Sequence, residues 1–194
     1  MTHEELRRRL RIIAAEPHTD EIVYGDDRVG AFDRPPTPAA VLVPVVLGEP
    51  PGILLTKRNA HLSAHAGQVS FPGGRMDPGE QPEDTALREA EEEIALDPRD
   101  VQVLGRMANY LTRSNFRVTP VLALLPPGLA FRPSPHEVDA VFELPIDVLL
   151  DPNAPERRRQ DGREYWVWPH PDHFIWGATA AMLVHLAEKL RALG

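Results

Sequence analysis

The stretch that most constrains this chain runs from Gly73 to Leu96, GGRMDPGEQPEDTALREAEEEIAL. Its opening Gly-Gly pair and the DPG at 77–79 favour a tight loop with positive φ angles. Pro82 then stands where a first helical residue belongs, and the acidic residues after it suit the positive end of a helix dipole. Nothing that breaks a helix follows as far as Ala95. The sequence therefore predicts a glycine loop followed by a helix.

Acidic side chains gather along one edge of this helix. At about 100° per residue, Glu89, Glu92 and Glu93 fall within an arc of roughly 100°. The stripe of mostly small apolar residues beside them is formed by Ala86, Ala90 and Ile94. Like charges at this spacing destabilise a helix by roughly 0.2–0.5 kcal/mol per pair, and burial raises the pKa of each carboxyl group further. A hard divalent cation removes the conflict, so the pattern indicates a Mg²⁺ or Mn²⁺ site, with a solvated acidic face as the alternative.

The spacing of these residues resembles the box of the Nudix family, G-x5-E-x7-R-E-U-x-E-E-x-G-U, in which U is an aliphatic residue. The matching positions are Gly74, Glu80, Arg88, Glu89, Glu92, Glu93 and Leu96. Ala95 stands in place of the last glycine of the box, and Ala90 is a small residue at an aliphatic position. We expect the first departure to change how the helix ends, because the αL conformation suits alanine less well than glycine. No acidic residue is lost.

The resemblance implies an α+β protein with the Nudix fold, a mixed β-sheet sandwiched between α-helices (α/β/α). It implies an enzyme, a pyrophosphatase that hydrolyses a nucleoside diphosphate linked to another moiety. Glu89 and Glu93 are then direct Mg²⁺ or Mn²⁺ ligands, Glu92 is a ligand or a partner of the ligands, and the Gly73 carbonyl is a further oxygen. Glu80 and Arg88 are expected to pair across the loop and the helix and to hold the carboxylates. Whether Glu89 is a base or a ligand stays open.

Upstream of the box, LLTKR at 54–58 and GQVSFPGG at 67–74 resemble the coenzyme A pyrophosphatase branch of the same family, as does IWGATA at 175–180. Leu62 and His65 also match, whereas Asn59 replaces a serine and Ser63 replaces an arginine that would meet a substrate phosphate. This resemblance implies hydrolysis of coenzyme A or its derivatives to 4′-phosphopantetheine and adenosine 3′,5′-bisphosphate. The candidate substrate-binding residues are Lys57, Arg58, Gln68 and Phe71.

Two other functions remain open at this point. One is a pyrophosphatase that acts on ADP-ribose, nucleotide sugars or nucleoside triphosphates. The other is a non-catalytic nucleotide-binding domain, although such domains usually lose box glutamates. Glu137, at the start of an apolar run, is a candidate for a further base or metal ligand, with a surface glutamate as the equal alternative. A single histidine such as His65 is usually a loop residue of no consequence.

Length and composition indicate the number of domains, the cellular location and the class of partner. At 194 residues the chain suits one domain, with an N-terminal helix and irregular crossing over 1–38 and a core with a C-terminal helix over 39–194. The absence of cysteine fits a cytoplasmic protein, and no apolar run reaches the ~20 residues of a membrane helix. A net charge of −8 argues against nucleic acid as a partner. The expected partner is a small nucleoside diphosphate derivative resembling coenzyme A; oligomeric state stays open.

The remaining elements follow from hydrophobic periodicity and turn residues. We expect an amphipathic helix over 3–15 that packs through Leu6, Leu10 and Ile13, and a short helix over 145–150. We expect strands over 39–47, 53–58, 67–71, 101–111, 116–125 and 138–144, a hairpin over 156–169 that turns at 161–162, and a final helix after 173. Trp176 is expected to face the core.

Overall fold

The computed structural model describes residues 1–17, 22–23, 33–61, 65–160 and 162–194. The helices are α1 (His3–Ala14), α2 (Pro82–Ile94), α3 (Ile146–Leu150) and α4 (Gly177–Ala192), with a 3₁₀ turn at Pro98–Asp100. The strands are β1 (Ile22–Val23), β2 (Thr37–Val46), β3 (Gly52–Arg58), β4 (Val69–Ser70), β5 (Gly73–Arg75), β6 (Gln102–Arg106), β7 (Asn109–Leu111), β8 (Phe116–Leu125), β9 (Val138–Pro145), β10 (Glu156–Gln160), β11 (Arg163–Trp168) and β12 (Ile175–Trp176).

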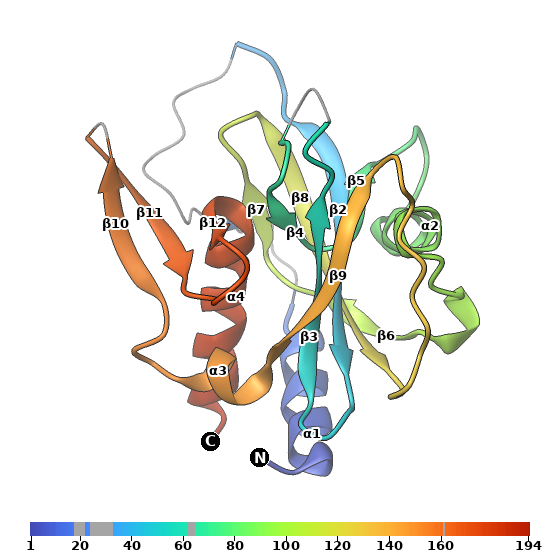
Figure 1. Cartoon of the computed structure of the whole chain (residues 1–194), viewed down its shortest axis with the longest axis vertical. Coiled ribbons are helices and arrows are strands. Elements are labelled where there is room, and N and C mark those ends of the chain that lie inside the picture. Colours follow the sequence, from blue (N-terminus) through green and yellow to red (C-terminus); the bar gives the residue numbers. More distant parts are fainter. Residues whose placement is uncertain (18–21, 24–32, 62–64, 161) are drawn as a thin grey trace.

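Strands β1 to β9 form one mixed sheet, and β10, β11 and β12 form a small second sheet (Figure 1). The centre of the large sheet is the parallel pair β2–β8, which stays in register from Thr37 opposite Phe116 to Val46 opposite Leu125. Both strands are largely buried, and accordingly they read as continuous apolar runs. β3 lies antiparallel to β9, and β5 lies antiparallel to β2. The predicted mixed sheet is confirmed.

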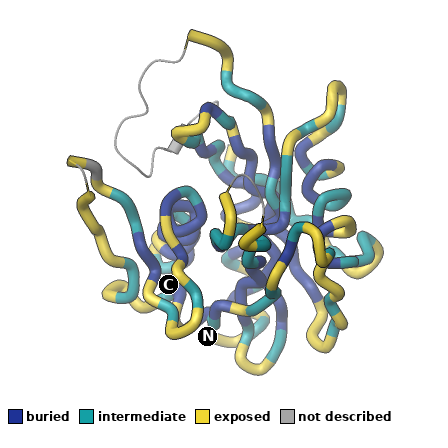
Figure 2. The backbone as a smooth tube through the Cα atoms, turned by 45° about the horizontal axis from the view of Figure 1, so that its top comes forward, coloured by how far each residue is buried: buried dark blue, intermediate teal, exposed yellow. Residues whose placement is uncertain are grey.

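Helices cover both faces of this sheet. Alternate residues of β2 face opposite ways: Ala40 and Leu42 pack with α2, whereas Val43 and Val45 pack with α1 and α4. The small side chains of Ala86 and Ala90 are fully buried, so α2 lies close against the sheet, as the stripe predicted. Figure 2 shows the buried backbone running through the middle of the molecule, beneath exposed loops. The predicted α+β sandwich is therefore confirmed.

The strand predicted over 101–111 is broken in two. β6 ends at Arg106 and β7 begins at Asn109, and the register against β8 already shifts between Val103 and Gly105. Gly105 has φ +152°, and a Cβ there would lie 2.6 Å from the Ala14 carbonyl oxygen at the end of α1. The chain therefore bulges where α1 packs against it, and the sequence pattern alone did not reveal this contact.

The final helix begins later than predicted. Ile175 and Trp176 pair with β11 as strand β12, and Gly177, at φ +62°, leads into α4. Trp176 is 38% exposed, so the prediction that it faces the core was wrong. Its strand neighbour Ile175 is fully buried instead, because successive strand residues point to opposite faces.

The remaining sequence predictions concern α1, two hairpins, the segment 67–71 and the crossing over 17–38. The buried face of α1 is the predicted one, and the hairpins β7–β8 and β10–β11 form where predicted. The strand predicted over 67–71 is reduced to Val69–Ser70, since Gly67, at φ +68°, belongs to a turn. Most of the irregular crossing predicted over 17–38, together with Leu62, Ser63 and Asp161, lies outside the described residues, while β2 already begins at Thr37. Among the described helices, none is long and apolar enough to cross a membrane.

Candidate active site

The two glycines that open the predicted loop lie in β5, packed between β2 and α2. A Cβ on Gly73 would lie 2.4 Å from the Ala40 carbonyl oxygen, and a Cβ on Gly74 would lie 2.4 Å from the carboxyl carbon of Glu89. Real Cβ atoms do not approach other atoms so closely, so a side chain at Gly73 would displace the β2 backbone, whereas one at Gly74 would displace only the Glu89 carboxylate. The glycine pair thus brings the β5 backbone against the acidic edge of α2.

Helix α2 ends in the left-handed conformation although no glycine is present. Ala95 has φ 55° and ψ 36°, its N–H donates to the Glu91 carbonyl at 2.9 Å, and Leu96 N–H donates to the Ala90 carbonyl at 3.4 Å. The expectation that alanine changes the helix end was therefore wrong. The αL conformation costs an alanine about 1–2 kcal/mol, and the burial of Leu96, which is 3% exposed, helps to hold it.

Glu80 and Arg88 pair as predicted. The Arg88 Nε donates to Glu80 Oε1 at 2.9 Å, and Nη2 donates to Oε2 at 3.2 Å. Oε2 also accepts from the Thr85 hydroxyl at 2.6 Å and from the Asp77 N–H at 2.9 Å. Thr85 was not predicted as a site residue, because nothing in the sequence distinguished it from other residues of the helix. These donors, led by Arg88, lower the pKa of Glu80 to about 2.

This lowered pKa predicts an acid-sensitive contribution to stability. A carboxyl group with a pKa near 4.5 in the unfolded chain and about 2 in the folded chain stabilises the fold fully above pH ~5, and this contribution is lost as the pH falls towards 2. Glu80→Gln should lower the melting temperature at pH 7, and the difference from the wild type should shrink steadily between pH 5 and pH 2. Thermal melts across this range test it, and a difference that does not vary with pH would contradict it.

Arg88 also joins the loop to the acidic edge of α2. Its Nη1 donates to Glu89 Oε1 at 2.9 Å and lies 3.5 Å from Glu92 Oε2. The Glu89 side chain is only 17% exposed, whereas that of Glu92 is 57% exposed. Burial raises the pKa of Glu89 despite the nearby guanidinium. Of the three predicted acidic residues, Glu92 is thus the one on the rim.

Glu93 is the most deeply placed carboxyl group of the site, at 2% exposed. Its Oε1 lies 3.5 Å from Arg58 Nη1, and its Oε2 accepts a long hydrogen bond of 3.4 Å from the Gly73 N–H. Burial raises its pKa to about 8; Arg58 lowers it, and the charges of Glu89 and Glu137 raise it further. Within the described protein, the positive charge of Arg58 does not offset the cost of burying an ionised Glu93 carboxylate.

Glu137, held as a candidate from the sequence, comes to the same place. Its charge contributes to the raised pKa values of both Glu89 and Glu93. Its backbone is fixed, because its N–H donates to the Ser134 carbonyl at 3.0 Å and its carbonyl accepts from the Asn59 N–H at 2.8 Å. The structure therefore gathers Glu89, Glu93 and Glu137 from two segments, while their chemical roles stay predictions.

The donor set fits a hard divalent cation, because it consists of carboxylate oxygens whose charges are poorly compensated. In the described parts of the chain, no three acidic or histidine side chains already stand in the arrangement of a metal site. Glu89 and Glu93 contact Arg88 and Arg58 instead. Each of these contacts uses the Oε1 atom of the carboxylate, which leaves Oε2 as a candidate ligand atom. The ligand roles of Glu89, Glu92, Glu93 and the Gly73 carbonyl stay predictions.

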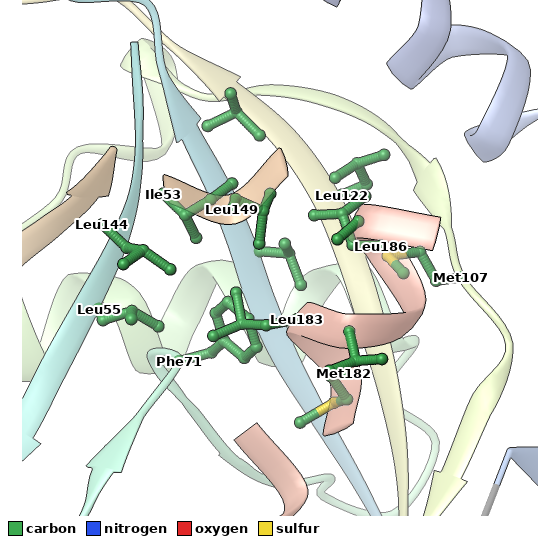
Figure 3. Close-up of a cluster of buried hydrophobic side chains, with 14 of the residues drawn as sticks. Ile53, Leu55, Phe71, Met107, Leu122, Leu144, Leu149, Met182, Leu183 and Leu186 are labelled. Atoms are coloured by element: carbon green, nitrogen blue, oxygen red, sulfur yellow. The ribbon is translucent and has the colours of Figure 1, made fainter. Parts of the chain in front are cut away.

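The predicted substrate-binding residues separate. Arg58 lies at the glutamates, and its buried Nε has no hydrogen-bond partner among the described residues. Lys57 pairs with Asp139 at 2.8 Å, and Gln68 Oε1 contacts His65 Nδ1 at 2.9 Å. Phe71 is 2% exposed and packs with core residues such as Leu55 and Leu183 (Figure 3). Its role as a substrate contact stays a prediction, and the structure places this side chain, directly after β4, in the core on the α4 side.

The fold and the glutamate-bearing loop and helix define a Nudix domain, and the family model described as the NUDIX domain matches residues 36–175. This chain belongs to the Nudix hydrolase family, whose members are enzymes that act on phosphoanhydride bonds and generally use divalent metals.

Known proteins support the assignment. An uncharacterized Nudix hydrolase, NudL of Photorhabdus laumondii, is 43% identical over 159 residues, which cover 79% of this chain and 84% of that protein. RenU, a Nudix hydrolase from M. smegmatis, superposes with a TM-score of 0.56 at 22% identity over 85% of this chain and 92% of its own. The C. elegans Ap4A hydrolase in a binary complex gives a TM-score of 0.53 at 19% identity, over 79% and 93%. These two similarities show the fold.

Proposed function

We propose that this Nudix hydrolase cleaves the diphosphate linkage of coenzyme A or its derivatives to 4′-phosphopantetheine and adenosine 3′,5′-bisphosphate, with Mg²⁺ or Mn²⁺. The observation that carries the proposal is the segment LLTKR…GQVSFPGG, which resembles the coenzyme A branch. Its first half ends at Arg58, 3.5 Å from Glu93, and its second half ends at the glycines that contact α2. Both halves therefore border the acidic edge.

The residues divide the work as follows. Glu89 and Glu93, with Glu92 and the Gly73 carbonyl, would hold the cation, which neutralises phosphate oxygens and favours a deprotonated water. Glu80 and Arg88 position the carboxylates. Arg58, whose side chain is 27% exposed, offers a guanidinium to a phosphate. This local positive charge would attract an anionic substrate to a chain of net charge −8.

A proton must leave the attacking water as its oxygen bonds to phosphorus and the anhydride P–O bond breaks. Glu137 and Glu89 are the two candidates to accept it. Burial raises the pKa of Glu89, which makes its carboxylate a stronger base than an exposed one. The broken bond leaves a phosphate monoester on each product.

A substrate panel tests the proposal. Purified protein is incubated with coenzyme A, dephospho-coenzyme A, ADP-ribose, a nucleotide sugar and deoxynucleoside triphosphates, each with Mg²⁺ or Mn²⁺. We expect the highest kcat/KM for coenzyme A, the two products named above by mass spectrometry, and complete loss of turnover in a chelator, restored by added metal. A clear preference for ADP-ribose would overturn the specificity but not the hydrolase assignment.

A further inference from the structure

A second cavity lies on the other side of β3 and β9, away from α2. It has a volume of about 620 Å³ and is lined by β11 and the loop that leads to β12, chiefly Trp168, His170, Asp172, His173 and Phe174, with Arg158 from β10. Ligand pockets in proteins measure about 300–1,000 Å³, so the cavity is large enough for a nucleobase. Every one of these residues belongs to the described chain.

Aromatic rings dominate its walls. The ring of His173 stacks on Phe142 at 3.8 Å between centroids, with 22° between the planes, and His170 lies 4.9 Å from His173. On the opposite side, the Arg158 guanidinium lies 5.8 Å over the ring of Phe174, which is 52% exposed. Such rings and guanidinium planes are the groups on which proteins stack bases.

Polar groups of the cavity also lack partners. Buried Nδ1 of His173 and Nε1 of Trp168 have no hydrogen-bond partner within the described parts of the chain. A buried polar atom without a partner costs about 1–3 kcal/mol, but both atoms lie beneath the surface of the cavity, so they are not counted as contacts to a ligand.

The charge of the cavity distinguishes a base from a phosphate. Arg158 donates through Nε and Nη2 to Glu156 at 3.0 and 2.8 Å, so its charge is largely compensated. Asp172 adds a carboxylate, with its own N–H donating to His170 Nδ1 at 3.2 Å. Among the described residues that line the cavity, Arg158 is the only arginine or lysine, so positive charge is not concentrated there as a phosphate site requires. The cavity therefore suits an uncharged heterocycle that can both donate and accept hydrogen bonds.

The cavity adjoins the candidate active site. Phe142, which carries the His173 stack, lies in β9, the strand that begins directly after Glu137. At the end of β3, Lys57 pairs with Asp139 on β9, and its positive charge contributes to the lowered pKa of His173. The next residue, Arg58, contacts Glu93 instead. Successive strand residues point to opposite faces, so the two sites flank the same strand end.

Resting on the proposed function, we propose that this cavity holds the adenine base of the substrate while the diphosphate lies at Glu93. Of the two ends of coenzyme A, only the adenosine end has a ring to stack, because the pantetheine arm has none. Asp172 can accept a hydrogen bond from the exocyclic amine of adenine, and the rings of His170, His173 and Phe174 supply the stacking surface. The substrate then crosses the strand end between the two faces.

The tryptophans of the chain make a direct test possible. All three, Trp166, Trp168 and Trp176, lie in β11 and β12 beside the cavity. Intrinsic fluorescence therefore reports this region, whereas hydrolysis reports α2. The full chain is titrated without metal with adenosine, pantetheine and inorganic phosphate. We expect a saturable change with adenosine alone.

Variants identify the site. His173→Ala should weaken adenosine binding about tenfold, the lower part of the range for a lost base–aromatic stack, and should raise KM for coenzyme A with kcat unchanged. Arg159→Ala is the matched control: Arg159 is exposed and follows Arg158 on β10, so it faces away from the cavity. Asp172→Ala, at an exposed position, removes the proposed acceptor and serves as a second variant if His173→Ala does not fold; it too should weaken adenosine binding.

The outcomes separate the two proposals. No saturable response to adenosine, or an equal response in wild type, His173→Ala and Asp172→Ala, overturns the cavity assignment even if coenzyme A is hydrolysed. A response that these variants weaken supports the assignment even if coenzyme A is not hydrolysed, in which case only the proposed function fails.

Discussion

Glu93→Gln is expected to reduce metal-dependent hydrolysis by roughly a thousandfold or more while the fold is retained. The substitution keeps the size of a side chain that is 2% exposed, and it removes the negative charge that would hold the cation against the phosphate. Steady-state turnover with Mg²⁺ or Mn²⁺ is the measurement, and circular dichroism confirms the fold. Full activity in this variant would remove the assignment of Glu93.

A matched control lies two positions away. Glu91 is exposed and belongs to the same helix but not to its acidic edge, so Glu91→Gln should retain wild-type turnover.

The Glu93→Gln variant also predicts a pH-dependent change in stability. Because burial raises the pKa of Glu93 to about 8, the folded wild type loses stability as the pH rises from about 4.5 through 8. The neutral glutamine does not titrate, so Glu93→Gln should gain melting temperature relative to wild type over that interval.

Gly73→Ala is expected to destabilise the fold by roughly 2–4 kcal/mol, which corresponds to a fall in melting temperature of roughly 5–15 °C for a chain of this size. The new methyl group would meet the backbone of β2, at 2.4 Å from the Ala40 carbonyl oxygen and 2.6 Å from the Val41 Cα, and φ is +157°. Neither backbone atom can move without disturbing the centre of the sheet. Thermal or urea unfolding measures the change.

The neighbouring glycine provides the contrast. A Cβ on Gly74 would meet only the carboxyl end of Glu89, a flexible side chain, so Gly74→Ala should leave most of the stability intact and reduce turnover by displacing that carboxylate. Gly79→Ala is the control for a positive φ alone, since φ is +87° there and no atom lies within 4 Å. A large loss of stability in Gly74→Ala, or none in Gly73→Ala, would contradict this account.

The parts of the site that sequence predicted are those fixed by local spacing. The glycine loop, the start of α2 at Pro82, the buried alanine stripe and the pairing of Glu80 with Arg88 all lie within a short segment, where helix and turn geometry decide which side chains meet. The place of Glu137 depended on how β9 returns beside β3. Local spacing does not determine that return, so the sequence offered Glu137 only as one of two alternatives.

The burial of Phe71 and the exposure of Trp176 have a common physical cause. Phe71 and Trp176 each lie on a two-residue strand or directly beside one, where the face of a side chain depends on which neighbour pairs with the backbone. Ile175 and Trp176 point to opposite faces of the small sheet by a single step of strand alternation, so Ile175 is buried and Trp176 is exposed. Ala95 shows the reverse case: tertiary packing around Leu96 and the loop at 132–134 imposed a conformation that its own preference disfavours.

The hydrogen bonds at the end of α2 have a consequence for how the substrate specificity of the enzyme can evolve. Arg132 N–H donates to the Ile94 carbonyl at 2.9 Å and Ser134 N–H to the Glu93 carbonyl at 2.8 Å, just before Glu137. Backbone hydrogen bonds thereby join the two segments that supply the acidic side chains. Substitutions of the residues around the site can therefore change which substrate is accepted, while the spacing between the backbone segments that carry Glu93 and Glu137 is kept.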